Sequence, residues 1–158
     1  MNLASDVLFL VISSHGASEP SIAVSNSGLP LNDMSDADLA EALHDSGIKW
    51  RVIIISACYA GGFIDALKNP RSIVITAAAA DRTSFGCSND RDLTYFGEAF
   101  FRDALPEARS LRDAFEKAKS AIEQRERRER VDASKPQAYF GAELEAKLVA
   151  MKDHAPQP

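Results

Sequence analysis

The chain has 158 residues, of which 46% are hydrophobic and 26% charged, and its formal net charge at pH 7 is -5. These values are typical of one globular domain with its own core. The acidic balance argues against a nucleic-acid binder. No apolar run reaches the roughly 18 residues of a membrane span, so we expect no membrane contact by this segment itself. The start lacks a signal peptide, which leaves the compartment open between cytoplasm and periplasm.

In chain order, the sequence alternates unbroken apolar runs with segments of helical periodicity. Such runs are typical of strands buried on both faces of a parallel sheet, and apolar residues at intervals of three and four are typical of helices. Ser35 and Ser110 each precede an aspartate by three residues, which indicates a helix start. We predict strands at 6–14, 51–56, 72–78 and 136–141, a short strand within 22–24, and helices at 35–47, 62–68, 95–105, 110–130 and 142–151.

This order of elements predicts an α/β fold with a largely parallel sheet. We expect a single domain at 1–151, followed by a disordered tail at 152–158. Charges alternate along 123–130, which favours a solvated helix surface over a binding patch. A buried strand at 6–14 needs neighbours on both sides. Later segments, a partner or the preceding part of a longer protein could supply the second neighbour.

Two reactive side chains follow two of the predicted strands. His15 comes directly after 6–14, and Cys58 follows 51–56 and precedes the small residues of Ala60–Gly62. Consecutive parallel strands lie side by side about two-thirds of the time, with their carboxyl ends at one edge. The two side chains are therefore predicted to face each other, and the alternative is a buried structural cysteine.

A cysteine beside an imidazole can attack a carbonyl group. The imidazole takes the thiol proton or stabilises the thiolate, and it can later protonate the leaving amine. The backbone N–H groups of Gly16 and Cys58 are candidates for an oxyanion hole, since glycine allows close approach. Cys58 and Cys87 could pair under oxidising conditions, but they are too few for a disulfide scaffold and lack zinc-ligand spacing. We expect no metal and no cofactor.

Four ordered motifs between about residues 6 and 105 resemble the legumain (asparaginyl endopeptidase) family of caspase-related cysteine peptidases, especially its bacterial members. They are Ser14-His15-Gly16 after a strand, Ser56-Ala-Cys58-Tyr-Ala-Gly-Gly62, the segment Thr76–Cys87, and Asp92-Leu-Thr-Tyr-Phe-Gly-Glu98.

The resemblance implies a caspase-like three-layer α/β/α sandwich and hydrolysis of peptide or protein substrates after asparagine or aspartate. It assigns a His15–Cys58 dyad, with Gly16 in the oxyanion hole, and a substrate-binding acid at Glu98. The family's second pocket acid stands where this chain has Ser56, and that departure weakens the inference to asparagine.

The family's first strand has no counterpart in the sequence. The resemblance therefore implies the C-terminal part of a peptidase domain, whose parent protein could be membrane-attached. A sheet without its first strands exposes an edge, and exposed edges pair, so we expect a homodimer through that edge.

Two functional hypotheses from other protein classes stay open at this point. An α/β-hydrolase or a glutamine-amidotransferase-like domain usually places its catalytic histidine after the nucleophile. The only histidine downstream of Cys58 is His154, in the predicted tail, which argues against both. A catalytically impaired peptidase-like module acting through protein contacts is the non-enzymatic alternative.

Overall fold

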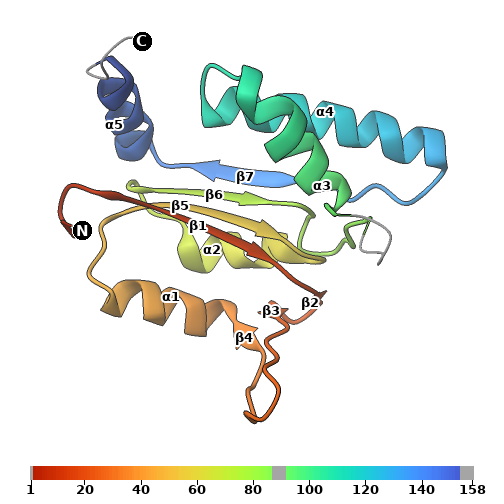
Figure 1. The fold of residues 1–158 in the computed structure, drawn as a ribbon, viewed down its shortest axis with the longest axis horizontal. Coiled ribbons are helices and arrows are strands. Elements are labelled where there is room, and N and C mark those ends of the chain that lie inside the picture. The colour runs from red at the N-terminus through yellow and green to blue at the C-terminus, as the bar shows by residue number, and fades with distance from the viewer. Residues whose placement is uncertain (1, 87–91, 154–158) are drawn as a thin grey trace.

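A computed structural model describes residues 2–86 and 92–153, which form three layers around one sheet (Figure 1). The main sheet has the order β1-β5-β6-β7. Its first three members run parallel, and β7 is antiparallel to β6. These strands are β1 (Val7–Ser13), β5 (Trp50–Ser56), β6 (Ser72–Thr76) and β7 (Gln137–Phe140). The α/β class and the mostly parallel sheet are confirmed.

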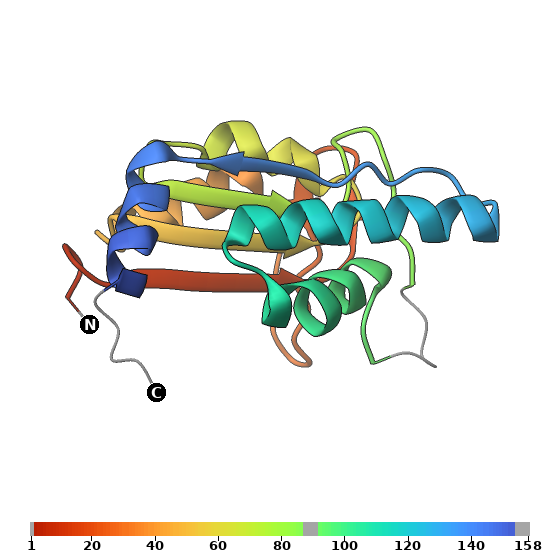
Figure 2. The same cartoon turned by 90° about the horizontal axis from the view of Figure 1, so that it is seen from above.

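Helices cover both faces of this sheet, as Figures 1 and 2 show. One face carries α3 (Tyr95–Gly97), the π-helix η2 (Glu98–Ala104), η3 (Leu105–Glu107), α4 (Leu111–Glu129) and α5 (Ala142–Asp153). The other face carries α1 (Asp36–Asp45), η1 (Ala60–Phe63) and α2 (Ile64–Leu67).

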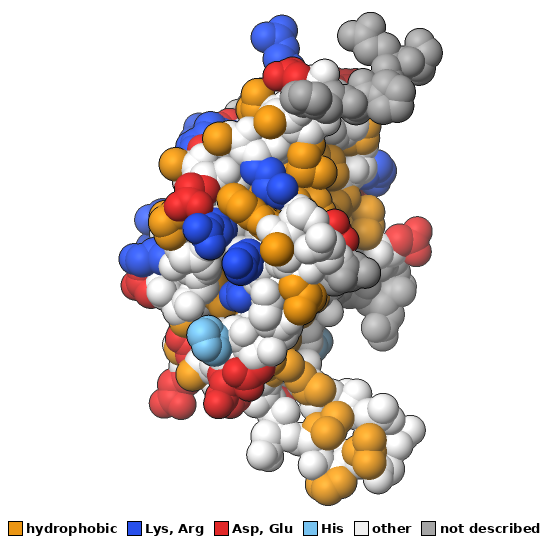
Figure 3. All heavy atoms as spheres, turned by 90° about the vertical axis from the view of Figure 1, so that its left-hand side faces the viewer, with side chains coloured by type: hydrophobic (Ala, Val, Ile, Leu, Met, Phe, Trp, Pro, Cys, Tyr) orange, Lys and Arg blue, Asp and Glu red, His pale blue; other side chains and the backbone are white. Residues whose placement is uncertain are grey.

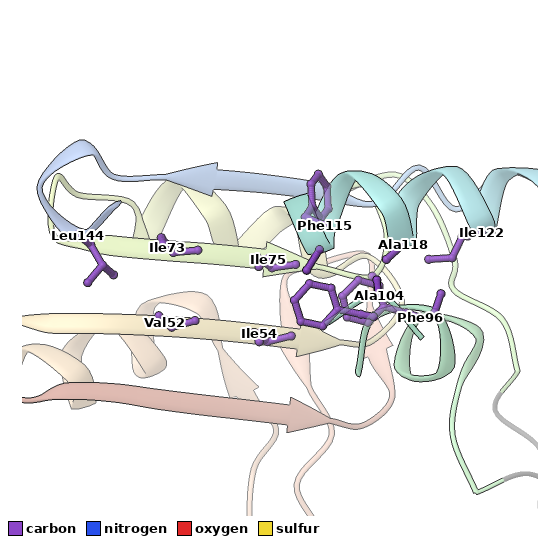
Figure 4. Packing of buried hydrophobic residues seen from close by; sticks show 14 residues of the cluster. Val52, Ile54, Ile73, Ile75, Phe96, Ala104, Phe115, Ala118, Ile122 and Leu144 are labelled. Carbon is purple, nitrogen blue, oxygen red and sulfur yellow. The ribbon is translucent and has the colours of Figure 1, made fainter. Parts of the chain in front are cut away.

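Residues of β5 and β6 alternate between two hydrophobic clusters, one on each face of the sheet. Toward α4, Val52 and Ile73 pack with the phenylalanines of η2 and α4 (Figure 4). Toward α1, Ile53 and Ile55 pack with Phe63. The side chains of Val52, Ile53, Ile55 and Ile73 are at most 1% exposed, so each contributes about 1.5–3 kcal/mol of burial free energy. Burial on both faces, predicted from the unbroken apolar runs, is confirmed for β5 and β6.

The first strand, β1, forms an edge of the main sheet (Figure 2). It pairs with β5 on one side, and no strand of the described part of the chain pairs with its other side. Leu8 and Leu10 pack toward α1, but Phe9 is 55% and Val11 50% exposed on the opposite face. The prediction of burial on both faces was wrong for β1, because this edge strand is packed along its length on the α1 side only.

A second, three-stranded sheet follows β1. It consists of β2 (Gly16–Ala17), β3 (Ser21–Ile22) and β4 (Met34–Ser35). The connection between β3 and β4 projects from the molecule, and apolar side chains gather at its tip, at the lower end in Figure 3. Leu29 and Leu31 of this connection are 59% and 46% exposed. The sequence predicted only part of this sheet, near Ile22.

The predicted helix starts are confirmed. Ser35 and Asp38 form a complete capping box at α1, and the Ser110 side chain accepts a hydrogen bond from the Asp113 N–H at α4. Helix α5 extends to Asp153, two residues into the predicted tail, while residues 154–158 lie outside the described residues. Within the described residues, no helix combines the length and apolar character needed to cross a bilayer.

Candidate active site

Cys58 lies directly after β5, at the carboxyl edge of the main sheet. The half-buried cysteine is followed by Tyr59, which has a left-handed backbone with φ 57°. The chain then enters η1, and the Gly61 N–H donates to the Ala78 carbonyl at 2.9 Å. A Cβ at Gly61 would lie 2.6 Å from the Ala80 nitrogen, so only glycine allows this close contact. The sharp turn presents Cys58 at the strand end.

His15 leaves β1 at the same edge and level as Cys58. The parallel register pairs Ser13 with Ser56, and the Ser14 N–H donates to the Ser56 carbonyl at 3.2 Å. His15 and Cys58 therefore stand at equivalent positions beyond neighbouring strands. A Cβ at Gly16 would lie 2.1 Å from the Cys58 carbonyl oxygen. The residue after His15 is thus packed against the cysteine backbone, and the exposed imidazole lies at the same end of the sheet.

The Gly16 N–H is not used by the small sheet. Gly16 pairs in register with Ile22, and the Ala23 N–H donates to the His15 carbonyl at 2.9 Å. In an antiparallel ladder, this bond makes Gly16 and Ile22 a non-hydrogen-bonded pair. The Gly16 N–H consequently points away from β3. Among the described residues, the Cys58 N–H also has no recorded backbone acceptor.

The connection after β6 contacts the Cys58 sulfur. The Ser84 N–H points at Cys58 Sγ at 3.3 Å, and the sulfur lies 3.6 Å from the Ser84 carbonyl oxygen and 3.7 Å from its hydroxyl. The Tyr59 N–H donates to the Arg82 carbonyl at 2.7 Å in the same region. Sequence reasoning gave Ser84 no role, although the residue lies inside one of the four motifs. Cys87, the predicted possible partner of Cys58, lies outside the described residues.

Ser56, predicted to bind substrate, is only 3% exposed. Its hydroxyl group lies 2.9 Å from the Thr94 hydroxyl, so it links β5 to the start of α3. The Glu98 N–H donates to the Thr94 carbonyl at 2.9 Å, which places Glu98 one helical turn from this link. A direct contact of Ser56 with substrate stays a prediction.

Glu98, the second predicted substrate-binding residue, has a carboxylate between two arginines. Arg125 of α4 bonds it at 2.6 Å and Arg102 at 3.2 Å. The Arg125 guanidinium also lies 3.6 Å from the centre of the Tyr95 ring, a cation–π arrangement. These residues line a cavity of about 310 Å³. No recorded contact joins Glu98 to Cys58 in the described part of the chain, so its role in specificity stays a prediction.

The model of the Peptidase C13 family matches residues 1–146 of the chain. The chain belongs to the Peptidase C13 family. This is the legumain family of cysteine peptidases, and the match confirms the resemblance carried by the four motifs. It sets aside the α/β-hydrolase and amidotransferase alternatives. No curated protein matches the chain.

Membership of the Peptidase C13 family makes the protein a cysteine-type peptidase, and therefore a hydrolase. Such a peptidase needs a thiol at a reachable position. Cys58 is the one free cysteine among the described residues. It is half-buried rather than sealed in the core.

Proposed function

We propose that the protein hydrolyses peptide bonds after asparagine, or after aspartate, through a dyad of His15 and Cys58. The observation that carries this proposal is the shared strand edge. Residues Ser13 and Ser56 are in register, and Gly16 packs against the Cys58 carbonyl at a distance that admits no side chain. The imidazole and the thiol thus leave one edge from neighbouring strands.

In the proposed first step, His15 accepts the thiol proton and the Cys58 sulfur attacks the substrate carbonyl carbon. The new C–S bond gives a tetrahedral oxyanion, which the N–H groups of Gly16 and Cys58 stabilise. When the C–N bond breaks, the His15 imidazolium protonates the leaving amine. Water activated by the imidazole then attacks the thioester, and breakage of the C–S bond releases the carboxylic acid and the thiol.

Ser84 holds the Cys58 sulfur in this scheme. Its N–H points at Cys58 Sγ at 3.3 Å. The Ser84 carbonyl oxygen lies 3.6 Å from the same sulfur and can accept a hydrogen bond from the thiol. The connection after β6 therefore positions the Cys58 sulfur for attack and contributes to the shape of the site.

The preference for asparagine rests on the family and on Glu98. The Glu98 carboxylate has Arg125 and Arg102 beside it, so the region offers both hydrogen-bond acceptors and donors. A carboxamide can donate to a carboxylate and accept from a guanidinium, whereas a lysine side chain can only donate. Ser56, which stands where the family has an acid, removes one negative charge and makes aspartate more acceptable than it would be with two acids.

The test uses short peptides that end in an electrophile and carry asparagine, aspartate or lysine next to it. We expect the asparagine and aspartate probes to label Cys58, and the lysine probe to label it at least tenfold more slowly. Cys58→Ala should abolish labelling, and His15→Ala should reduce it by about 10²-fold or more. His44→Ala is the matched control, because His44 is also an exposed histidine and lies on α1.

The proposal fails if iodoacetamide alkylates Cys58 no faster than it alkylates free cysteine, since the thiol would then not be activated. One observation favours a catalytically impaired module in that case. Among the described residues, no recorded hydrogen bond orients the His15 side chain. Equal labelling of the wild type and the His15→Ala variant would support the impaired module.

A further inference from the structure

Glu126 is a buried carboxylate near the end of α4. Its side chain is 2% exposed. One carboxylate oxygen accepts a hydrogen bond from the Ser134 N–H at 3.1 Å, and the other has no hydrogen-bond partner among the described residues. Burial of a carboxylate with one oxygen unpaired is costly, so its presence calls for a physical reason.

The Glu126 side chain anchors the segment that follows α4. The stretch 130–135 begins at Arg130 and ends at Lys135, and both have left-handed backbones, with φ 58° and 52°. Arg130 is the left-handed cap of α4, held by its N–H and the Val131 N–H, which both donate to the Glu126 carbonyl, whereas Lys135 depends on its surroundings. The hydrogen bond from Ser134 to Glu126 is the one recorded side-chain anchor of this stretch within the described residues.

A short series of hydrogen bonds leads from this segment to the active-site loop. The Ser134 carbonyl accepts the Ala79 N–H at 2.9 Å, and the Ala79 carbonyl accepts the Arg82 N–H at 3.1 Å. The Arg82 carbonyl accepts the N–H of Tyr59, the residue after Cys58, at 2.7 Å. The loop between Ala79 and Arg82 is thus held between the Glu126 anchor on one side and the cysteine turn on the other.

We propose that Glu126 is a positioning residue for Cys58, acting through Ser134 and the loop at 79–84. This inference rests on the proposed function, because it assigns Glu126 to the same active site. The same loop delivers the Ser84 N–H to the Cys58 sulfur. Displacement of Ser134 frees the Ala79 N–H. The loop then holds less firmly its two contacts with the cysteine turn, which are the Arg82 carbonyl at Tyr59 and the Ser84 N–H at the thiol.

A positioning role and a purely stabilising role differ in what a substitution changes. Loss of the anchor should lower kcat in molecules that are still folded, because misplacement of a reacting group by about 1 Å can cost 10²-fold in rate. It should leave KM nearly unchanged, since Glu126 does not touch the site. A purely stabilising residue would change the melting temperature alone.

The experiment compares Glu126→Met, which removes the acceptor, with Glu126→Gln, which keeps one carbonyl oxygen for the Ser134 N–H. Leu144→Ala is the control for lost stability, because Leu144 is fully buried on α5. Three quantities are measured well below the melting temperature: kcat, KM and hydrogen exchange at the Ala79 amide. If Glu126→Met does not fold, Glu126→Asp replaces it, since its shorter side chain cannot reach Ser134.

We expect Glu126→Met to lower kcat at least tenfold and to speed exchange at Ala79, and Glu126→Gln to restore both. Leu144→Ala should lower the melting temperature without either effect. The proposal would be overturned if Glu126→Met had the same kcat and the same exchange rate at Ala79 as the wild type. It would also be overturned if Leu144→Ala lost as much kcat as Glu126→Met. If the wild type itself is inactive, the proposed function fails, and faster or unchanged exchange at Ala79 still decides whether Glu126 holds the loop.

Discussion

Replacement of Gly16 by alanine tests the packing of the two strand ends directly. A Cβ built at Gly16 lies 2.1 Å from the Cys58 carbonyl oxygen and 3.3 Å from the Ala57 side chain. Real contacts of this kind are rarely shorter than 3.0 Å. The backbone at Gly16 or at Cys58 must therefore move by about 1 Å to accept the methyl group, and no flexible side chain can absorb the shift.

Two consequences follow for Gly16→Ala. Overpacking of this kind costs about 1–3 kcal/mol, which corresponds to a fall in Tm of roughly 2–12 °C for a domain of this size. The same shift moves the Gly16 N–H away from the proposed oxyanion position. Loss of one such donor lowers kcat by about 10²–10³-fold, so we expect a fall in kcat of at least 10²-fold with little change in KM.

The assay measures kcat with a peptide substrate, and Tm by thermal denaturation, for Gly16→Ala and for the control Gly28→Ala. Gly28 has φ 92° and no atom within 4 Å of an added Cβ. Its replacement therefore costs about 1–2 kcal/mol through backbone strain alone, without any contact at the active site. A Gly16→Ala variant with kcat within twofold of wild type would refute the reasoning.

Three further predictions concern the sheet edge, a helix start and the sulfur contact. We propose that two copies of the protein associate through the edge of β1 that no described strand covers. In the ultracentrifuge, the wild type should sediment as a dimer at micromolar concentration and Val11→Lys as a monomer. A stable wild-type monomer would refute this proposal. Ser35→Ala should lower Tm by about 2–4 °C without changing kcat. Hydrogen bonds from the Ser35 side chain and backbone lower the pKa of Asp38 below 3.8. The stabilisation that these bonds give to the folded protein is present above about pH 4 and is lost as the pH falls through the lowered pKa. The difference in Tm between the wild type and Ser35→Ala should therefore shrink in acid. Ser84→Pro, which removes the N–H at the sulfur, should slow alkylation of Cys58 severalfold, whereas Ser84→Ala should not.

Much of the framework could be predicted because its causes are local. The apolar run of β5 indicates burial on both faces, and the capping side chain of Ser35 indicates the start of α1. Even the placement of residues 15 and 58, 43 positions apart, beyond neighbouring strand ends follows from a general rule, because a crossover connection aligns the carboxyl ends of parallel strands. The apolar pattern of each strand and the right-handed crossover between them together bring the two strand ends to one edge of the sheet.

Other features depend on contacts that no local pattern encodes. An apolar run looks the same whether one or both faces of a strand are covered, so the exposure of Phe9 on β1 could not be predicted. The pairing of Glu98 with Arg125 joins residues 27 positions apart on separate helices. The contact of Ser84 with the Cys58 sulfur depends on the path of a loop without periodicity. Such details are fixed by tertiary packing.

The left-handed backbone of Tyr59 has a consequence for laboratory evolution. A side chain at φ 57° is strained, and glycine at this position would relieve about 1 kcal/mol. A selection for thermostability alone would therefore favour Tyr59→Gly. The same change would free the peptide next to Cys58 to sample other conformations, because glycine has no preference for the turn that presents the thiol. Variants selected for heat resistance should accordingly be screened for turnover, since at this position the two properties oppose each other.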